Sequence, residues 1–189
     1  MLKLEIMNKK EQKLLYSIEI NKAIILRLAA FGTLLLFLGM MLFSSLTGSG
    51  NESSGNPALG LLVFIVMLAG HEGVHGLFFK AFGGSPTYGV SVMYKLLPYA
   101  YATSEKDRFR LGQMYVIGLS PLILISVFSI LLGIVFPGTA YYAMIIFAGN
   151  FSGAIGDMWL ARQLHRFRGV QNLGIVDAKA GVKVYGDQI

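Results

Sequence analysis

The sequence contains no cysteine, and this absence restricts the sites that the chain can form. Without thiols there can be neither disulfide bonds nor thiolate metal ligands. A bound metal ion must therefore be held by histidine nitrogens and carboxylate oxygens, which 3 histidines and 10 acidic residues supply.

Charged residues are also few: they make up 14% of the 189 residues, whereas 54% of the residues are hydrophobic. Soluble domains have about 25% charged residues, so this composition indicates a membrane protein. The net charge of +6 would suggest nucleic-acid binding in a soluble protein. Here the basic residues gather beside the apolar segments, as the topology of a membrane protein requires, and we expect no nucleic-acid partner.

Four long apolar segments run through the sequence, at residues 23–46, 58–82, 111–136 and 141–164. Each exceeds the roughly 20 residues that a helix needs to cross a lipid bilayer. We therefore expect an all-α polytopic membrane protein with four transmembrane helices. A polar amino-terminal segment at residues 1–22 precedes this membrane domain, and a polar tail at residues 165–189, with room for a small strand pair, follows it.

A short insert between the second and third apolar segments has a different pattern. Residues 88–94 and 98–103 alternate small or polar residues with larger apolar ones. This period of two is typical of β-strands, so we expect a short β-hairpin or a membrane-dipping loop within residues 85–104. Its first strand, residues 87–94, would then be able to hold an extended peptide by edge pairing.

Lysine and arginine are distributed asymmetrically around the apolar segments. They gather in residues 1–22, in residues 80–110 and toward the carboxy terminus, whereas residues 47–57 and 137–140 contain none. Cytoplasmic loops carry the excess of basic residues in membrane proteins. The pattern therefore predicts that both termini are cytoplasmic, in what we expect to be the cell membrane.

The sequence His-Glu-Gly-Val-His at residues 71–75 lies in the later half of the second apolar segment. On a helix, residues four apart share one face, so His71 and His75 can hold one zinc ion. Glu72 can reach a water molecule there without being a ligand. Ionisable groups at membrane depth are costly and usually functional, so the pattern predicts a metal site with Glu72 as its general base.

Asp157 is the candidate third ligand, because it is a carboxylate inside the fourth apolar segment. Counted from the predicted external ends of the helices, it lies about 30 Å along its helix and the two histidines about 21–27 Å along theirs. Alternatively, Asp157 bonds a backbone group or Arg162 in a helix pair packed through glycines. Glu105 and His165 are further candidates, but both have charged neighbours typical of an interface.

Asn150 lies two turns before Asp157 on nearly the same helix face. It can line the same cavity and help to stabilise an oxyanion during hydrolysis of a substrate, or it can simply bond between helices. The sequence leaves both interpretations open.

Together these features resemble the site-2 protease superfamily of intramembrane zinc metalloproteases, and most closely its small relatives known as membrane zincin peptidases. The likeness covers about residues 58–164: HExxH in an apolar helix, a strand-like insert, and a late-helix aspartate that follows an asparagine. It implies that zinc is the cofactor, bound by His71, His75 and Asp157. Glu72 would then be the catalytic base in the hydrolysis of peptide bonds of membrane-associated proteins or peptides.

A second function class fits the same residues. A non-enzymatic membrane protein that carries or senses metal ions, or a protease-derived chaperone, would need the same three ligands. It would not need Glu72 as a base, so this residue separates the two hypotheses. Neither hypothesis fixes an oligomeric state.

The charge distribution generates a prediction about topology. Single cysteines placed within residues 47–57 should react with an impermeant thiol reagent added to intact cells, whereas cysteines at Lys106 or in the tail should not. The chain has no native cysteine, so the labelling background is absent. Labelling of the Lys106 position from outside would contradict the predicted orientation.

Overall fold

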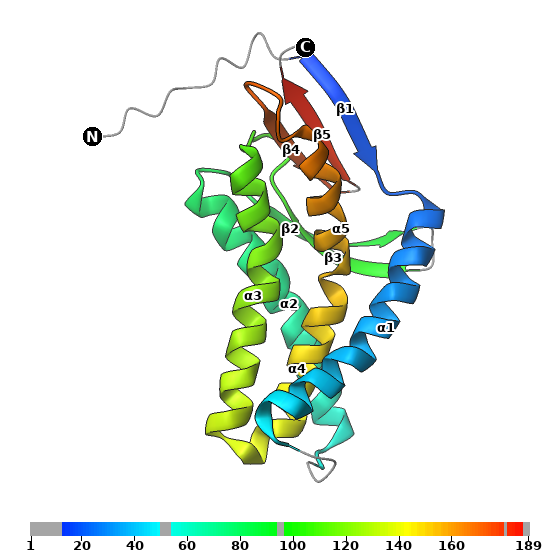
Figure 1. Ribbon diagram of the computed structural model, residues 1–189, viewed down its shortest axis with the longest axis vertical. Coiled ribbons are helices and arrows are strands. Elements are labelled where there is room, and N and C mark those ends of the chain that lie inside the picture. The colour runs from blue at the N-terminus through cyan, green and yellow to red at the C-terminus, as the bar shows by residue number, and fades with distance from the viewer. Residues whose placement is uncertain (1–12, 50–53, 94–96, 180, 187–189) are drawn as a thin grey trace, which may run out of the picture.

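The structure is a computed structural model that describes residues 13–49, 54–93, 97–179 and 181–186. Four apolar helical segments lie together, a three-stranded sheet covers one end of them, and a two-stranded hairpin lies at their side (Figure 1). Residues 1–12, more than half of the predicted amino-terminal segment, lie outside the described residues.

The helices are α1 (Lys22–Thr47), α2 (Pro57–Ala81), α3 (Leu111–Val135), α4 (Ala140–Gly153) and α5 (Ile155–Leu164), with short 3-10 helices at Pro137–Thr139 and His165–Phe167. The strands are β1 (Lys13–Glu19), β2 (Thr87–Met93), β3 (Leu97–Thr103), β4 (Gly174–Ala178) and β5 (Gly181–Gly186). Strand order in the larger sheet is β1-β5-β4, and β2 pairs with β3.

Local sequence sets the ends of the first two helices. The side chains of Asn21 and Asn56 accept hydrogen bonds from backbone amides in the first turns of α1 and α2. An asparagine in this position satisfies amides that have no partner within the helix, and Pro57, the first residue of α2, has no amide hydrogen to satisfy. Gly48 ends α1 at a φ of 68°, a left-handed conformation that glycine adopts without strain.

Four helical segments are long and apolar enough to cross a membrane, which suggests a membrane protein. Large apolar side chains cover their outward faces, among them Phe31, Met41 and Leu61, each more than half exposed. So extensive an apolar surface marks contact with something other than water. The four predicted helices are therefore confirmed as helices, and their passage through a bilayer stays a prediction.

The fourth predicted helix, residues 141–164, is present as two pieces, α4 and α5, which meet at Ala154. Hydrogen bonds continue across the junction, because Ala154 N donates to Asn150 O at 3.0 Å and Met158 N donates to Ala154 O at 2.9 Å. The junction places Asp157 in the first turn of α5.

The all-α fold that the sequence predicts lacks the three-stranded sheet seen in the structure. The strand pair expected in the tail is present as β4 and β5. Strand β1 joins this pair from the opposite end of the chain, as the blue and red arrows in Figure 1 show. The strand with which β1 pairs lies at the other end of the chain, so a local pattern could not reveal this pairing. The sheet packs on the helix ends through a buried cluster that contains Ile18, Phe79, Phe109, Ile117, Leu164, Ile175, Val182 and Val184.

The expected hairpin between the second and third apolar segments is confirmed. Strands β2 and β3 pair in antiparallel register from Thr87 opposite Thr103 to Met93 opposite Leu97. The hairpin packs on α2 where that helix has Gly76, because a β-carbon at Gly76 would collide with the Tyr88 ring.

Small residues bring α1 against the fourth helical segment. Gly32 and Gly39 are buried on α1, and Ser152 Oγ donates a hydrogen bond of 2.8 Å to Gly32 O. A β-carbon at Gly39 would lie only 3.1 Å from Ala148 Cα. Such close backbone contact between apolar helices depends on small side chains at the crossing.

This contact predicts a large difference between two glycine substitutions. Gly39→Leu should lower the thermal unfolding midpoint in detergent by several degrees, since overpacking of a close contact costs about 1–3 kcal/mol. Gly112→Leu is the control, because a β-carbon at Gly112 has no described neighbour within 4 Å. Equal midpoints for the two variants would show that the α1 crossing is not tightly packed.

Candidate functional site

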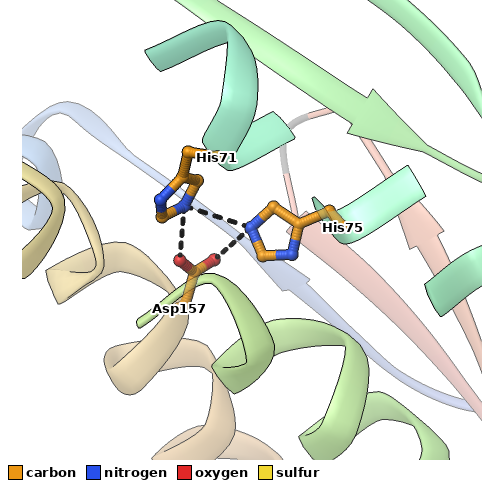
Figure 2. Close-up of side chains that lie close together, drawn as sticks. All are labelled: His71, His75 and Asp157. Atoms are coloured by element: carbon orange, nitrogen blue, oxygen red, sulfur yellow. Dashed lines mark hydrogen bonds and ion pairs between the residues drawn. The ribbon is translucent and has the colours of Figure 1, made fainter. Parts of the chain in front are cut away.

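Side chains from two helical segments converge inside the bundle (Figure 2). His71 and His75 come from α2, and Asp157 comes from the first turn of α5. Their potential ligand atoms all lie within 4.8 Å of one another. Asp157 Oδ2 is 3.2 Å from His71 Nε2, Asp157 Oδ1 is 3.5 Å from His75 Nε2, and the two Nε2 atoms are 3.2 Å apart. These three residues therefore lie close enough to bind one metal ion.

A glycine contact brings the fourth helical segment to α2. A β-carbon at Gly149 would lie 2.7 Å from Met67 Cε and 2.9 Å from Phe64 Cε2, both on α2. At Gly153, by contrast, a β-carbon would have no described neighbour within 4 Å, so the contact is made at Gly149. Asp157 then reaches the histidines two turns further along.

The orientation of His75 depends on a proline in α3. His75 Nδ1 lies 2.8 Å from Ile117 O. Within a regular helix that carbonyl would accept from the residue four positions later, but this residue is Pro121, which has no amide hydrogen. A carbonyl oxygen only accepts, so His75 Nδ1 donates to it, and in the neutral imidazole the lone pair lies on Nε2.

The orientation of His71 depends on Asn150, which is completely buried. Asn150 Nδ2 donates to Pro121 O and Leu122 O at 3.2 and 3.3 Å, and these carbonyls fix which end of the amide carries hydrogen. Asn150 Oδ1 must then face His71 Nδ1, which lies 2.9 Å away. His71 Nδ1 is therefore also the donor of its hydrogen bond, and in the neutral ring the lone pair lies on Nε2.

These protonation states decide what the cluster can hold. The two Nε2 atoms and the carboxylate of Asp157 lie 3.2 to 3.5 Å from one another, so two neutral rings direct two lone pairs at a carboxylate. Electron pairs this close repel, and a proton on one Nε2 or a metal ion among them relieves the repulsion. Neutral imidazole nitrogens and a carboxylate oxygen are the donor set that zinc accepts in three-ligand sites.

Glu72 belongs to the same helix but not to the cluster of converging atoms. Its Oε2 accepts a hydrogen bond of 2.7 Å from the backbone amide of Ala102 in β3. Ala102 lies opposite Tyr88 of β2, but its amide points away from β2 and donates to Glu72. The edge of β3 that does not pair with β2 therefore faces α2. Local sequence patterns do not reveal this link, although the alternation of residues 98–103 marks the strand that provides it.

A cavity of about 560 Å³ opens beside the cluster. Glu72, His75 and Asp157 lie on its wall, together with residues 99–103 of β3. The amino-terminal half of α1, parts of α3 and α5, and the turn between β4 and β5 complete the lining. The charged groups thus have access to a space large enough for several side chains.

The structure keeps the other sequence candidates apart from this cluster. Glu105 is exposed in the loop before α3. His165 lies 3.3 Å from Tyr115 Oη and 3.2 Å from an Arg168 nitrogen, at the end of α5. Within the described part of the chain, His71, His75 and Asp157 make up the one group of three or more potential ligands.

Comparison with known proteins agrees with this arrangement of residues. A family model described as "Putative zincin peptidase" (DUF3267) matches residues 64–169, which is more than half of the chain and includes the whole cluster. No curated protein and no solved structure matches the chain.

The buried contacts of Asn150 lead to a prediction about metal affinity. Asn150→Leu keeps the approximate volume but leaves His71 Nδ1 and two carbonyls without their partner. Loss of a group that orients a histidine ligand typically costs 10–100-fold in metal affinity, so zinc binding should fall by about that factor in a chelator competition. Ser129→Ala is the control, since this buried hydroxyl donates only to carbonyls of its own helix. Equal zinc affinities of the two variants would contradict the role of Asn150.

Proposed function

The chain belongs to the putative zincin peptidase family, and we propose that it is a zinc-dependent intramembrane peptidase, similar to site-2 proteases, that cleaves membrane-associated proteins or peptides. One observation carries this proposal: two histidines and an aspartate meet beside a glutamate at the wall of a cavity, inside helices apolar enough for a membrane. Metal-dependent peptide hydrolysis uses this combination of groups.

The residues present fit a zinc ion. His71, His75 and Asp157 would be the ligands, because their potential ligand atoms converge and the outer nitrogens of both rings are already bonded. When bound, zinc would supply Lewis-acid polarisation of a peptide carbonyl and of water. Three protein ligands also leave a position open for that chemistry.

Glu72 moves the protons in this proposal. It lies on the cavity wall next to His71 and takes a proton from the water that attacks the peptide carbonyl carbon. The carbon–nitrogen bond then breaks, and Glu72 passes the proton to the leaving nitrogen. The hydrogen bond from Ala102 N to Glu72 Oε2 holds the carboxylate in place for both transfers.

Asn150 is better placed to orient a ligand than to stabilise an oxyanion. Its buried amide is bonded to His71 on one side and to α3 on the other. Of the two roles that the sequence leaves open for this residue, we therefore assign it the bond between helices, which here orients His71.

The hairpin is the best-placed element for holding an extended substrate. The sequence predicts that residues 87–94 offer a strand edge, but the residues on the cavity wall are those of β3. The Ala102 amide points away from β2 and donates to Glu72, so a peptide would pair with the other backbone groups along this edge of β3. Such pairing would also hold the substrate in an extended conformation and expose its peptide bonds, which are hidden in a helical substrate.

The orientation in the membrane follows from the charges. We propose that the four helical segments cross the bilayer and that both termini, with the sheet that β1 and the tail form, are cytoplasmic. The cavity would then open near the cytoplasmic surface, since the turn between β4 and β5 forms part of its wall.

The substitution Glu72→Gln tests this function. Glutamine keeps an oxygen that can accept from Ala102 N, and it leaves the three proposed ligands unchanged. Zinc content should remain at about one ion per chain, while cleavage of a detergent-solubilised panel of labelled single-span proteins should fall at least about 10²–10⁴-fold. His71→Ala is the comparison variant and should lose both zinc and cleavage.

Two outcomes would contradict the proposed mechanism. Cleavage at the wild-type rate by Glu72→Gln would exclude this residue as the base. Zinc binding without cleavage of any member of the panel by the wild-type protein would favour the second candidate, a membrane protein that carries or senses metal ions.

A further inference from the structure

Asp177 occupies an unusual position for a carboxylate. It lies in β4 opposite Val182 of β5, and two residues away Ile175 lies opposite Val184. Paired residues and residues two apart share one face of a sheet, so Asp177 faces the same side as Ile175, Val182 and Val184. Those three side chains are at most 1% exposed and belong to the core between sheet and helices.

Asp177 differs from these neighbours because it lies at the cavity. The cavity wall includes the end of β4, residues 177 and 178, and Lys179 after it, together with Glu72 and His75. The sheet therefore extends past the core and presents a carboxylate, in place of another apolar side chain, toward the proposed active site.

No basic side chain of the described residues forms an ion pair with Asp177. Its polar neighbour is Thr103, the last residue of β3, whose side chain is 1% exposed and lies on the same cavity wall. Thr103 Oγ1 is close enough to lower the pKa of Asp177, yet within the described part of the chain it has no hydrogen bond of good geometry. Burial nevertheless dominates and raises the pKa of Asp177 to about 7, as expected for a carboxylate that lacks a cation.

The surrounding contacts hold these two polar groups in a fixed relation. Tyr99 Oη donates a hydrogen bond of 3.3 Å to Lys179 O, and Lys179 Nζ lies 5.3 Å from the centre of the Tyr101 ring. The β4–β5 turn and β3 thus form one continuous wall, and Lys179 is directed to the ring of Tyr101.

We propose that Asp177 and the Thr103 hydroxyl form a subsite that binds a lysine or arginine side chain of the peptide substrate. An ammonium or guanidinium group there would pair with the partly buried carboxylate and donate to the buried Thr103 hydroxyl, which offsets the cost of desolvating both groups. Because the subsite shares its cavity with Glu72 and His75, it fixes the basic residue at a set distance from the cleaved bond. This inference rests on the proposed function, since it names a feature of that enzyme's substrate.

Binding tests the subsite separately from cleavage. The protein carries Glu72→Gln, retains zinc and is purified in detergent. The probes are two fluorescent peptides with both ends blocked and a hydrophobic sequence, identical except for one central residue that is lysine or Nε-acetyl-lysine. Acetylation removes the charge and keeps the chain length, and the blocked ends exclude recognition of a free amino terminus. The lysine peptide should bind at least about tenfold more tightly, as a hydrogen bond to a charged group predicts.

Variants assign this preference to the subsite. Asp177→Asn should bind the two peptides equally, Asp177→Lys should prefer a matched glutamate peptide, and Thr103→Val should show a reduced preference for lysine. Glu105→Gln is the matched control, because it removes one acidic charge from the exposed loop outside the cavity and should keep the full preference. Zinc content and the unfolding midpoint of each variant show that it is folded.

Three results would overturn the subsite: equal binding of the two peptides by the Glu72→Gln protein, no binding of either, or an unchanged preference in Asp177→Asn. The first two need no change at Asp177, so they decide the question even where that variant fails to fold. A lysine preference without cleavage by the wild-type protein would support the subsite and contradict the proposed peptidase. Cleavage by the wild-type protein without such a preference would contradict the subsite alone.

Discussion

Two imidazole nitrogens and a carboxylate face one another inside a bundle of apolar helices, and the rest of the molecule makes this arrangement possible. Their Nε2 atoms are 3.2 Å apart, and each ring uses Nδ1 for a hydrogen bond on its far side, so that Nε2 is the nitrogen that faces the cluster. The repulsion among these atoms is relieved by a cation. The hydrogen bonds on the far side of each ring thus direct the Nε2 atoms toward Asp157, and zinc is the ion that the family implies.

Those outer hydrogen bonds come from helices other than the one that carries the histidines. Pro121 cannot donate to Ile117 O, so the carbonyl accepts from His75 and from Ser120 Oγ instead. Asn150 connects His71 to two carbonyls of α3 through a single buried amide. A proline or a polar side chain would weaken an isolated helix. Here each of them creates a hydrogen bond to a neighbouring helix.

The β-structure complements the helices at the same cavity. Strand β3 bonds to Glu72 through the Ala102 amide, and the turn between β4 and β5 closes on β3 through the contact between Tyr99 and Lys179. In our proposals the helices hold the zinc ion, while β3 and Asp177 bind the peptide. Segments from both ends of the chain are needed for this wall, because β1 pairs with β5 in the sheet whose strand β4 carries Asp177.

The sequence by itself determined the four helical segments, the hairpin between them and the grouping of His71, His75 and Asp157. Long apolar runs, a period of two and the spacing of four residues are local signals, and the high cost of a lone carboxylate in an apolar helix singled out Asp157. Only the tertiary structure decided that β1 pairs with β5, that Asn150 orients His71, and that Asp177 lies at the cavity. Each of these contacts joins residues far apart in the chain. A short strand in a polar segment, a buried amide or a carboxylate in a tail has no local pattern that names its partner, because the partner is chosen by the packing of the whole fold.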